Sequence, residues 1–193
     1  MHLLKIKIIE DFRCLKEGTE IDMLPLTLLV GEQGCGKSSL LEILQENEIE
    51  TTLSEDAQIN GVDSYFFDSE RMNPRMNSVD EYTNPDSTSR GIGPTAKALT
   101  HFESHGETLR KFTVDRIKDI KDCVLLMDEP EAAMSPKNQY KLIKEFKKAV
   151  NRNAQLIIAT HCIPLIESVE KVYSLEKLKW ISSKKFIEQS KKI

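Results

Sequence analysis

A phosphate-binding pattern, G-x-x-x-x-G-K-[ST], is matched by residues 31–38, whose sequence is GEQGCGKS. The loop follows the apolar run Leu26–Val30 and precedes apolar residues at helical spacing, so we expect it between a buried strand and a helix. Its glycines let backbone N–H groups converge on an anion, and Lys37 supplies a cation for the β- and γ-phosphates. The predicted ligands of a nucleoside triphosphate are Gly31, Gly34, Cys35, Gly36, Lys37, Ser38 and Ser39.

Two acidic residues, Asp128 and Glu129, come directly after the apolar run 123–127. This order places them at the carboxyl end of a buried strand, where open α/β sheets bind their ligands. Asp128 would hold Mg²⁺ together with Ser38, and Glu129 would act as the general base for an attacking water. The pair therefore predicts the metal-binding and hydrolytic part of a nucleotide site.

A histidine, His161, lies two residues beyond the next apolar run, Gln155–Ala159. If both runs are neighbouring parallel strands, this histidine reaches the same edge of the sheet as Glu129 and can hydrogen-bond the γ-phosphate. We therefore predict three catalytic residues: Lys37, Glu129 and His161.

The order of the predicted elements favours a parallel sheet. Pro136 marks the start of a helix with an apolar stripe, and this helix lies between two strand-like runs. A strand, helix, strand order indicates parallel strands. Residues 62–67 and 172–175 are further strand candidates, and the alternation in residues 3–9 predicts an N-terminal β element. We expect one α/β domain over residues 1–193, with helices on both faces of a mainly parallel sheet.

Composition excludes several classes of protein. The chain has 193 residues, 39% hydrophobic and 30% charged, with a formal net charge of -4. The charge argues against a surface that is basic throughout, which a general nucleic-acid binder would have. No apolar run approaches the ~20 residues that span a bilayer, and the N-terminus lacks the apolar core of a signal peptide. We expect a cytoplasmic protein without membrane insertion.

Two segments differ in composition from the rest of the chain. Residues 72–95 contain Asn-Pro and Gly-Pro pairs and few large apolar groups, which predicts a mobile loop. Residues 176–193 are interpreted as a Lys-rich C-terminal tail. Because residues 151–193 carry eight Lys or Arg against four Glu, DNA is one candidate partner of the tail, and solvated lysines are the simpler interpretation.

Together these motifs resemble the ATP-binding-cassette (ABC) type of ATPase, in the branch that includes the SMC, RecF and OLD-like head domains. The landmarks occur in the family's order: the phosphate loop, a divergent signature motif at residues 104–107, the carboxylate pair and the switch histidine. Residues 131–136 are similar to the D-loop of these proteins, and residues 8–15 to their first strand and turn. The resemblance spans most of residues 1–175.

The resemblance implies an ATP-sandwich homodimer that uses ATP and Mg²⁺. Each nucleotide would lie between the phosphate loop of one subunit and the signature of the other, so that Ser104 and Gly106 contact the γ-phosphate across the interface. Phe12 or Arg13 would pack against the adenine. The implied fold is that of an ABC ATPase head, a P-loop NTPase with an N-terminal antiparallel β element.

Some features depart from the family's pattern. Members usually have glutamine at the end of the strand predicted at residues 62–67, where this chain has Asp68, Ser69 or Glu70. The signature motif has His105 where Gly or Ser is more usual. Transporter subunits usually keep both features, which makes an ATP-binding transporter subunit the weaker alternative. Between the phosphate loop and the carboxylate pair the chain is too short for the long coiled coil of SMC proteins, so it resembles a bare head.

Three functions fit these residues. The first is an ATPase that dimerises on ATP and drives a conformational change in a separate effector protein; the family suggests roles in DNA repair, mobile-element maintenance or defence. The second is a nucleotide-switch scaffold that binds ATP without turnover. The third is a small-molecule P-loop kinase, which needs neither Glu129 beside Asp128 nor His161 after the next strand. The ATPase is favoured because it uses all of these residues.

Overall fold

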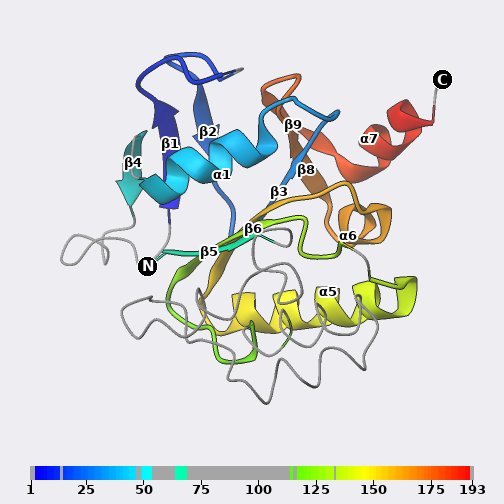
Figure 1. The fold of residues 1–193 in the computed structure, drawn as a ribbon. Helices are drawn as coiled ribbons and strands as arrows, with labels where there is room; N and C mark the ends of the chain where they lie inside the picture. Colours follow the sequence, from blue (N-terminus) through cyan, green and yellow to red (C-terminus); the bar gives the residue numbers. More distant parts are fainter. Residues whose placement is uncertain are drawn as a thin grey trace, which may run out of the picture.

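The computed structural model describes residues 3–13, 15–46, 49–53, 64–68, 114, 117–132 and 134–191. Its centre is a six-stranded sheet with the order β5-β6-β7-β3-β8-β9 (Figure 1). The strands are, in that order, β5 (Ser64–Asp68), β6 (Val124–Asp128), β7 (Gln155–Ala159), β3 (Leu26–Val30), β8 (Lys171–Ser174) and β9 (Lys179–Ser182). All neighbouring pairs are parallel except β8 and β9. The predicted α/β fold with a mainly parallel sheet is confirmed.

A second sheet is antiparallel and has the order β2-β1-β4. It contains β2 (Glu20–Asp22), β1 (Leu3–Ile8) and β4 (Ile49–Leu53). This sheet is the N-terminal antiparallel element that the family resemblance implies. Sequence analysis did not predict β4, because the acidic residues around its start are typical of a solvated segment.

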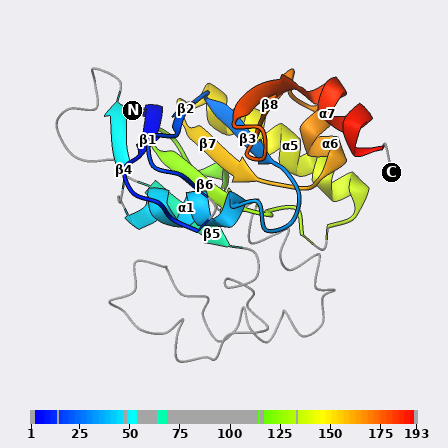
Figure 2. The ribbon, with the colours of Figure 1, turned by 90° about the horizontal axis from the view of Figure 1, so that it is seen from above.

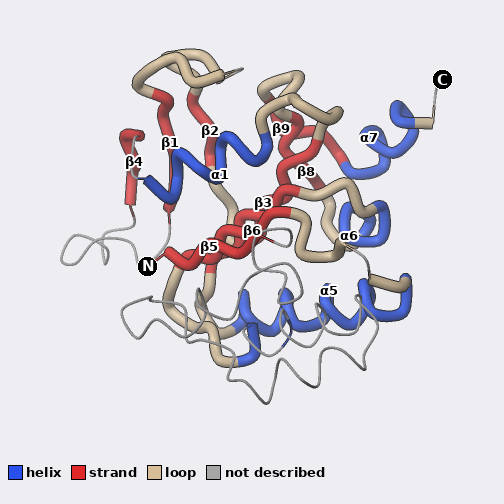
Figure 3. Tube along the Cα trace, in the orientation of Figure 1, coloured by secondary structure: helices blue, strands red, loops and turns tan. Residues whose placement is uncertain are grey.

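Helices cover both faces of the central sheet, as Figures 1 and 3 show. One face carries α1 (Lys37–Glu46), and the other carries α5 (Pro136–Asn151). The two remaining helices, α6 (Ile163–Glu167) and α7 (Ser183–Ser190), contribute to the core on the α5 side. Seen from above, the small sheet lies at one end of the molecule and α6 and α7 at the other (Figure 2).

The central strands divide their side chains between two hydrophobic cores. On β6, Leu125 packs in the core that contains Phe146 of α5, and Leu126 packs in the core that contains Leu40 of α1. Side chains alternate between the two faces of a strand, so a continuous apolar run is required where both faces are covered. The same rule explains the fully buried run of β7. The sheet is therefore held rigid from both sides.

Most of the Lys-rich segment is folded, which corrects its interpretation as a tail. It contains β9 and α7, and Ile181 and Ile187 are buried. The indole N–H of Trp180 donates a hydrogen bond to the backbone oxygen of Asp22 at 3.2 Å. Ser182 caps α7 by accepting a hydrogen bond from the backbone of Lys185. Apolar residues spaced among the lysines provide the contacts that hold this segment.

Some predictions concern residues outside the described ranges. The predicted mobile loop, residues 72–95, belongs to this group, as do Ser104 and Gly106 of the predicted signature motif. Across the described ranges, no helix has the length and apolar character needed to cross a membrane.

Replacing Phe146 with Ala should lower the free energy of unfolding by about 3–5 kcal/mol, because a fully buried ring leaves a cavity. The matched control is Tyr140→Ala on the same helix. Its side chain is 55% exposed, so the expected change is within about 0.5 kcal/mol. Urea denaturation measures both values. Equal losses in the two variants would contradict the orientation of α5.

Candidate active site

The phosphate-loop pattern connects β3 to α1, as predicted. Gly31 and Gly34 have φ angles of 150° and 77°, a region that residues with side chains rarely adopt. A Cβ atom on Gly31 would also lie 2.6 Å from the sulfur of Cys35. The loop therefore keeps its shape only with glycine at position 31.

Lys37 folds back over the loop from the first residue of α1. Its side chain is buried, and Nζ donates hydrogen bonds to the backbone oxygens of Gly31 at 3.1 Å and Glu32 at 3.0 Å. These bonds satisfy an ammonium group that would otherwise be costly to bury. These bonds hold the cation within the loop.

The turn between β8 and β9 supports the loop from a distant part of the sequence. The backbone N–H of Glu32 donates a hydrogen bond of 2.6 Å to Oε1 of Glu176. A cavity of about 370 Å³ adjoins this contact and is lined by Gly31, His161 and residues of α7, among others. The loop is therefore held by the C-terminal segment as well as by its own strand and helix.

The carboxyl ends of β5, β6 and β7 bring the predicted metal and catalytic residues to one edge. Asp128 ends β6 and pairs in register with Asp68 of β5 and Ala159 of β7. The next residue, Glu129, has a positive φ of 43°, and its N–H donates to the backbone oxygen of Ala159 at 3.0 Å. Non-glycine residues in this region of φ are often found at functional sites.

Glu129 and His161 approach each other across this edge. Oε1 of Glu129 lies 3.8 Å from Nε2 of His161, and the side chains are 48% and 42% exposed. The distance is longer than a hydrogen bond, and the pair attracts as ions only when the imidazole is protonated. Both reactive groups are therefore accessible and unconstrained by each other.

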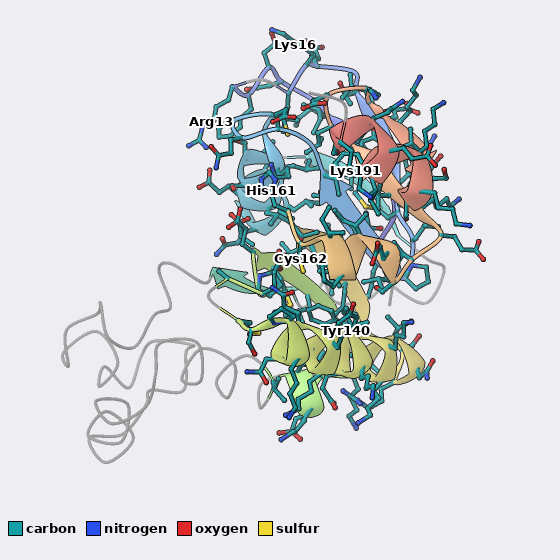
Figure 4. All side chains as sticks on the ribbon, turned by 90° about the vertical axis from the view of Figure 1, so that its right-hand side faces the viewer. Arg13, Lys16, Tyr140, His161, Cys162 and Lys191 are labelled. Carbon is teal, nitrogen blue, oxygen red and sulfur yellow. The ribbon has the colours of Figure 1, made fainter. Side chains whose placement is uncertain are left out.

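One cavity of about 450 Å³ joins the separate motifs. Figure 4 shows Arg13 and His161 on the same side of the molecule, and both line this cavity. Its lining residues are Arg13, Gln33, Gly34, Gly36, Lys37, Ser38, Ser39, Glu129 and His161. Among the predicted site residues that the structure describes, four do not line it: Gly31, Cys35, Phe12 and Asp128.

Arg13 lies at the cavity and links the first turn of the chain to α1. Its Nη1 donates to Oγ of Ser39 at 3.0 Å and forms an ion pair with Glu42, also at 3.0 Å. The guanidinium carbon lies 5.0 Å from the ring centre of Phe12, in cation–π range. Phe12 itself packs against the α1 core. Of the two residues predicted beside the adenine, Arg13 is therefore the one that faces the cavity.

Sequence analysis missed two buried polar residues behind the site. The Thr160 hydroxyl donates a hydrogen bond to Oε1 of Glu131, and both side chains are buried. Burial raises the pKa of Glu131 to about 7, above its ordinary value of 4.5. The available signal was their position: Thr160 directly precedes His161, and Glu131 follows Glu129 by two residues.

The sequence profile of the AAA ATPase domain family matches residues 1–88 and 104–166, more than half of the chain. The chain belongs to this family. The matched ranges of the AAA ATPase domain include every residue that lines the 450 Å³ cavity, and also Ser104 and Gly106.

Curated relatives of this AAA ATPase domain include EcfA2, the ATP-binding protein of the energy-coupling factor transporter of Streptococcus pyogenes. In several strains EcfA2 is 30% identical over 96 residues, which cover 49% of this chain and 34% of the relative. In other strains 25% identity extends over 198 residues, 82% of this chain and 69% of the relative. The more identical match therefore spans about a third of the relative's length.

Solved structures of ATP-binding cassettes share the fold. CbiO1 of the Clostridium perfringens ABC transporter complex cbiONQ has a TM-score of 0.55 and 14% identity, with 98% of this chain and 92% of that chain covered. The cassette MJ0796, in a dimeric post-hydrolysis state with ADP and Pi, has a TM-score of 0.50 and 13% identity, with 93% and 98% covered. This AAA ATPase domain thus has the fold of an ATP-binding cassette.

The raised pKa of Glu131 predicts a pH-dependent stability. A carboxyl whose pKa is higher in the folded than in the unfolded state favours folding below the unfolded value of about 4.5, and this contribution disappears as the pH rises through about 7. Relative to Glu131→Gln, the wild-type protein should therefore lose on the order of 3 kcal/mol between these pH values. Urea denaturation of both proteins from pH 4.5 to 8 measures this difference, and a constant difference would contradict the prediction.

Proposed function

We propose that this domain hydrolyses ATP with Glu129 and His161, and that two copies close around ATP for turnover. The observation that carries the proposal is the single cavity that joins the phosphate loop, Glu129 and His161. Each of these groups has a distinct task in transferring the γ-phosphoryl group to water.

The phosphate loop binds the triphosphate. When the β- and γ-phosphates enter, Nζ of Lys37 exchanges the backbone oxygens of Gly31 and Glu32 for phosphate oxygens. The predicted ligands that line the cavity are Gly34, Gly36, Ser38 and Ser39. Gly31 and Cys35 shape the loop through their close packing.

Ser38 and Asp128 would hold the magnesium ion. A hydroxyl and a carboxylate are oxygen donors of the kind Mg²⁺ prefers, so these residues fit the ion that the family implies. Ser38 lines the cavity, and Asp128 directly precedes Glu129 at the end of β6. Bound Mg²⁺ neutralises charge on the β- and γ-phosphates.

Glu129 acts on the attacking water, and His161 acts on the γ-phosphate. Glu129 orients the attacking water and accepts its proton, while the water oxygen bonds to γ-phosphorus and the bond from γ-phosphorus to the bridging oxygen breaks. His161 hydrogen-bonds a γ-phosphate oxygen. Their separation of 3.8 Å and their exposure leave both side chains free to contact these groups. The products are ADP and inorganic phosphate.

A second copy of the chain would close the cavity. Glu129 and His161 are each nearly half exposed, whereas a hydrolase must control the access of bulk water. By the family resemblance, Ser104 and Gly106 of the second copy would cover the γ-phosphate. The dimeric state of the MJ0796 cassette with ADP and Pi supports this arrangement. Arg13 would contact the adenine from the same subunit.

We infer that closure of the dimer acts on a separate effector protein, as in head domains of the SMC, RecF and OLD-like branch. The presence of Asp68 in register with Asp128, where transporter subunits usually have glutamine, supports this branch. The relatives and solved structures give no support to a DNA partner, and two lysines of residues 151–193 contact other side chains of the same chain. Lys177 hydrogen-bonds Gln189, and Lys171 lies 5.3 Å from the ring centre of Trp180.

Two alternatives are kept. Similarity to EcfA2 supports an ATP-binding subunit of a transporter, whose partner would be a membrane protein. His105 in the signature motif supports a nucleotide-switch scaffold without turnover. Phosphate release by the purified protein separates the scaffold from the ATPase, because a scaffold should not exceed the level of a Lys37→Ala variant.

Glu129→Gln should lower kcat by at least about 100-fold, because the amide cannot accept the proton of the attacking water. The uncleaved ATP should hold two copies together, so sedimentation velocity with ATP and Mg²⁺ should detect a dimer. The matched control is Glu167→Gln, which changes an exposed carboxylate of α6 outside the cavity and should leave turnover unchanged. A monomeric Glu129→Gln protein with wild-type turnover would refute the proposal.

Lys37→Ala should weaken binding of a non-hydrolysable ATP analogue by at least about 100-fold, because the loop loses its cation. Isothermal titration calorimetry measures the affinity. Lys147→Ala, an exposed substitution on α5, removes the same charge outside the cavity and serves as control. Equal affinities for the two variants would show that the analogue binds elsewhere.

A further inference from the structure

A buried hydrogen bond joins the loop after β6 to the loop after β7. The Thr160 hydroxyl donates to Oε1 of Glu131, and Thr160 Oγ1 accepts a hydrogen bond from the backbone N–H of Cys162 at 2.9 Å. Thr160 is fully buried, and Glu131 is 7% exposed. A hydrogen bond at such a depth is not exchanged with water, so it restrains both loops.

Both partners are adjacent to the proposed catalytic residues. Thr160 directly precedes His161, and Glu131 is separated from Glu129 only by Pro130. Backbone bonds continue the connection, because the N–H of Glu129 donates to Ala159 at 3.0 Å. Any shift of one loop relative to the other would therefore change the distance between the two catalytic side chains.

No hydrogen bond joins the two catalytic side chains. Glu129 and His161 are 3.8 Å apart, which is too long for a hydrogen bond, and both are accessible to water. Their relative position therefore depends on the backbone that carries them. The bond between Glu131 and Thr160 is a side-chain contact that crosses directly between these two loops.

We propose that Glu131 and Thr160 are positioning residues for ATP hydrolysis: their buried hydrogen bond fixes the loop of Glu129 against the loop of His161. This inference rests on the proposed roles of those two catalytic residues. Neither Glu131 nor Thr160 lines the cavity of about 450 Å³, so they affect the reaction only through the geometry of the loops.

The substitution that removes the bond with least change of shape is Thr160→Val. A misplacement of catalytic groups by about 1 Å can reduce a rate 100-fold, so kcat should fall by about tenfold or more. The KM for ATP should stay within about twofold, because the phosphate loop is unchanged. Thr160→Ser keeps the hydroxyl and should restore kcat to within about threefold of the wild-type value.

Thr27 offers a matched control at the opposite end of the sheet. It is also fully buried, and its hydroxyl likewise bonds to the backbone: it accepts a hydrogen bond from the N–H of Leu24 and donates one to the oxygen of Leu24. Thr27→Val should reduce stability without changing kcat. A loss of turnover caused only by general destabilisation would instead appear in both valine variants.

A double-substitution cycle tests whether Thr160 acts through His161. In a His161→Ala background, Thr160→Val should change the residual kcat by less than about twofold, because the group that it positions is absent. A wild-type kcat in Thr160→Val, or an equal loss with and without His161, would overturn the proposal.

A second readout does not require turnover. The imidazole signals of His161, assigned by their loss in His161→Ala, should shift in the nucleotide-free NMR spectrum of Thr160→Val and not of Thr27→Val. Unmoved signals would overturn the positioning role. By contrast, an inactive wild-type protein, or a Glu129→Gln protein as active as wild type, would refute the proposed function. Neither result would refute the positioning of the two loops by the hydrogen bond between Glu131 and Thr160.

Discussion

The parallel pairing of β6, β7 and β3 is the constraint on which the site depends. Asp128 pairs with Ala159, and Ala159 pairs with Leu29, so the carboxyl ends of the three strands meet at one edge. The loops that follow these strands therefore lie close together. The loop after β6 carries the carboxylate pair, the loop after β7 carries the histidine, and the phosphate loop follows β3. Hydrophobic cores on both faces fix the strands, so the sheet sets where each of these loops begins.

The side chains that take part in the reaction and the side chains that position them differ in their exposure to solvent. Glu129 and His161 are nearly half exposed, whereas Glu131 and Thr160 are buried and hydrogen-bonded to each other. A group that must meet the attacking water has to be accessible, and a group that fixes geometry gains from a low local dielectric. This difference explains why the cavity is open although the backbone around it has little freedom.

Sequence alone predicted the features that depend on local spacing. The phosphate loop follows from its glycine pattern, β7 has the predicted bounds, and α5 begins at Pro136 as expected. Features that depend on long-range contacts were not predicted. The strand β4 pairs with an edge of β1, and the Lys-rich segment buries Ile181 and Ile187 while Trp180 bonds to Asp22. The bond between Glu131 and Thr160 was not predicted either, since its partners meet only after β6 and β7 have paired.

The ammonium group of Lys37 has three hydrogen-bond acceptors in the chain's own loop: the backbone oxygens of Gly31 and Glu32 and the sulfur of Cys35. Phosphate oxygens at this ammonium would replace neutral acceptors with charged ones. The gain in free energy comes from the difference in charge, and because Lys37 is buried, dissolved ions screen this attraction less than one at the surface. The loop would therefore favour a highly charged polyphosphate over a monophosphate of similar shape.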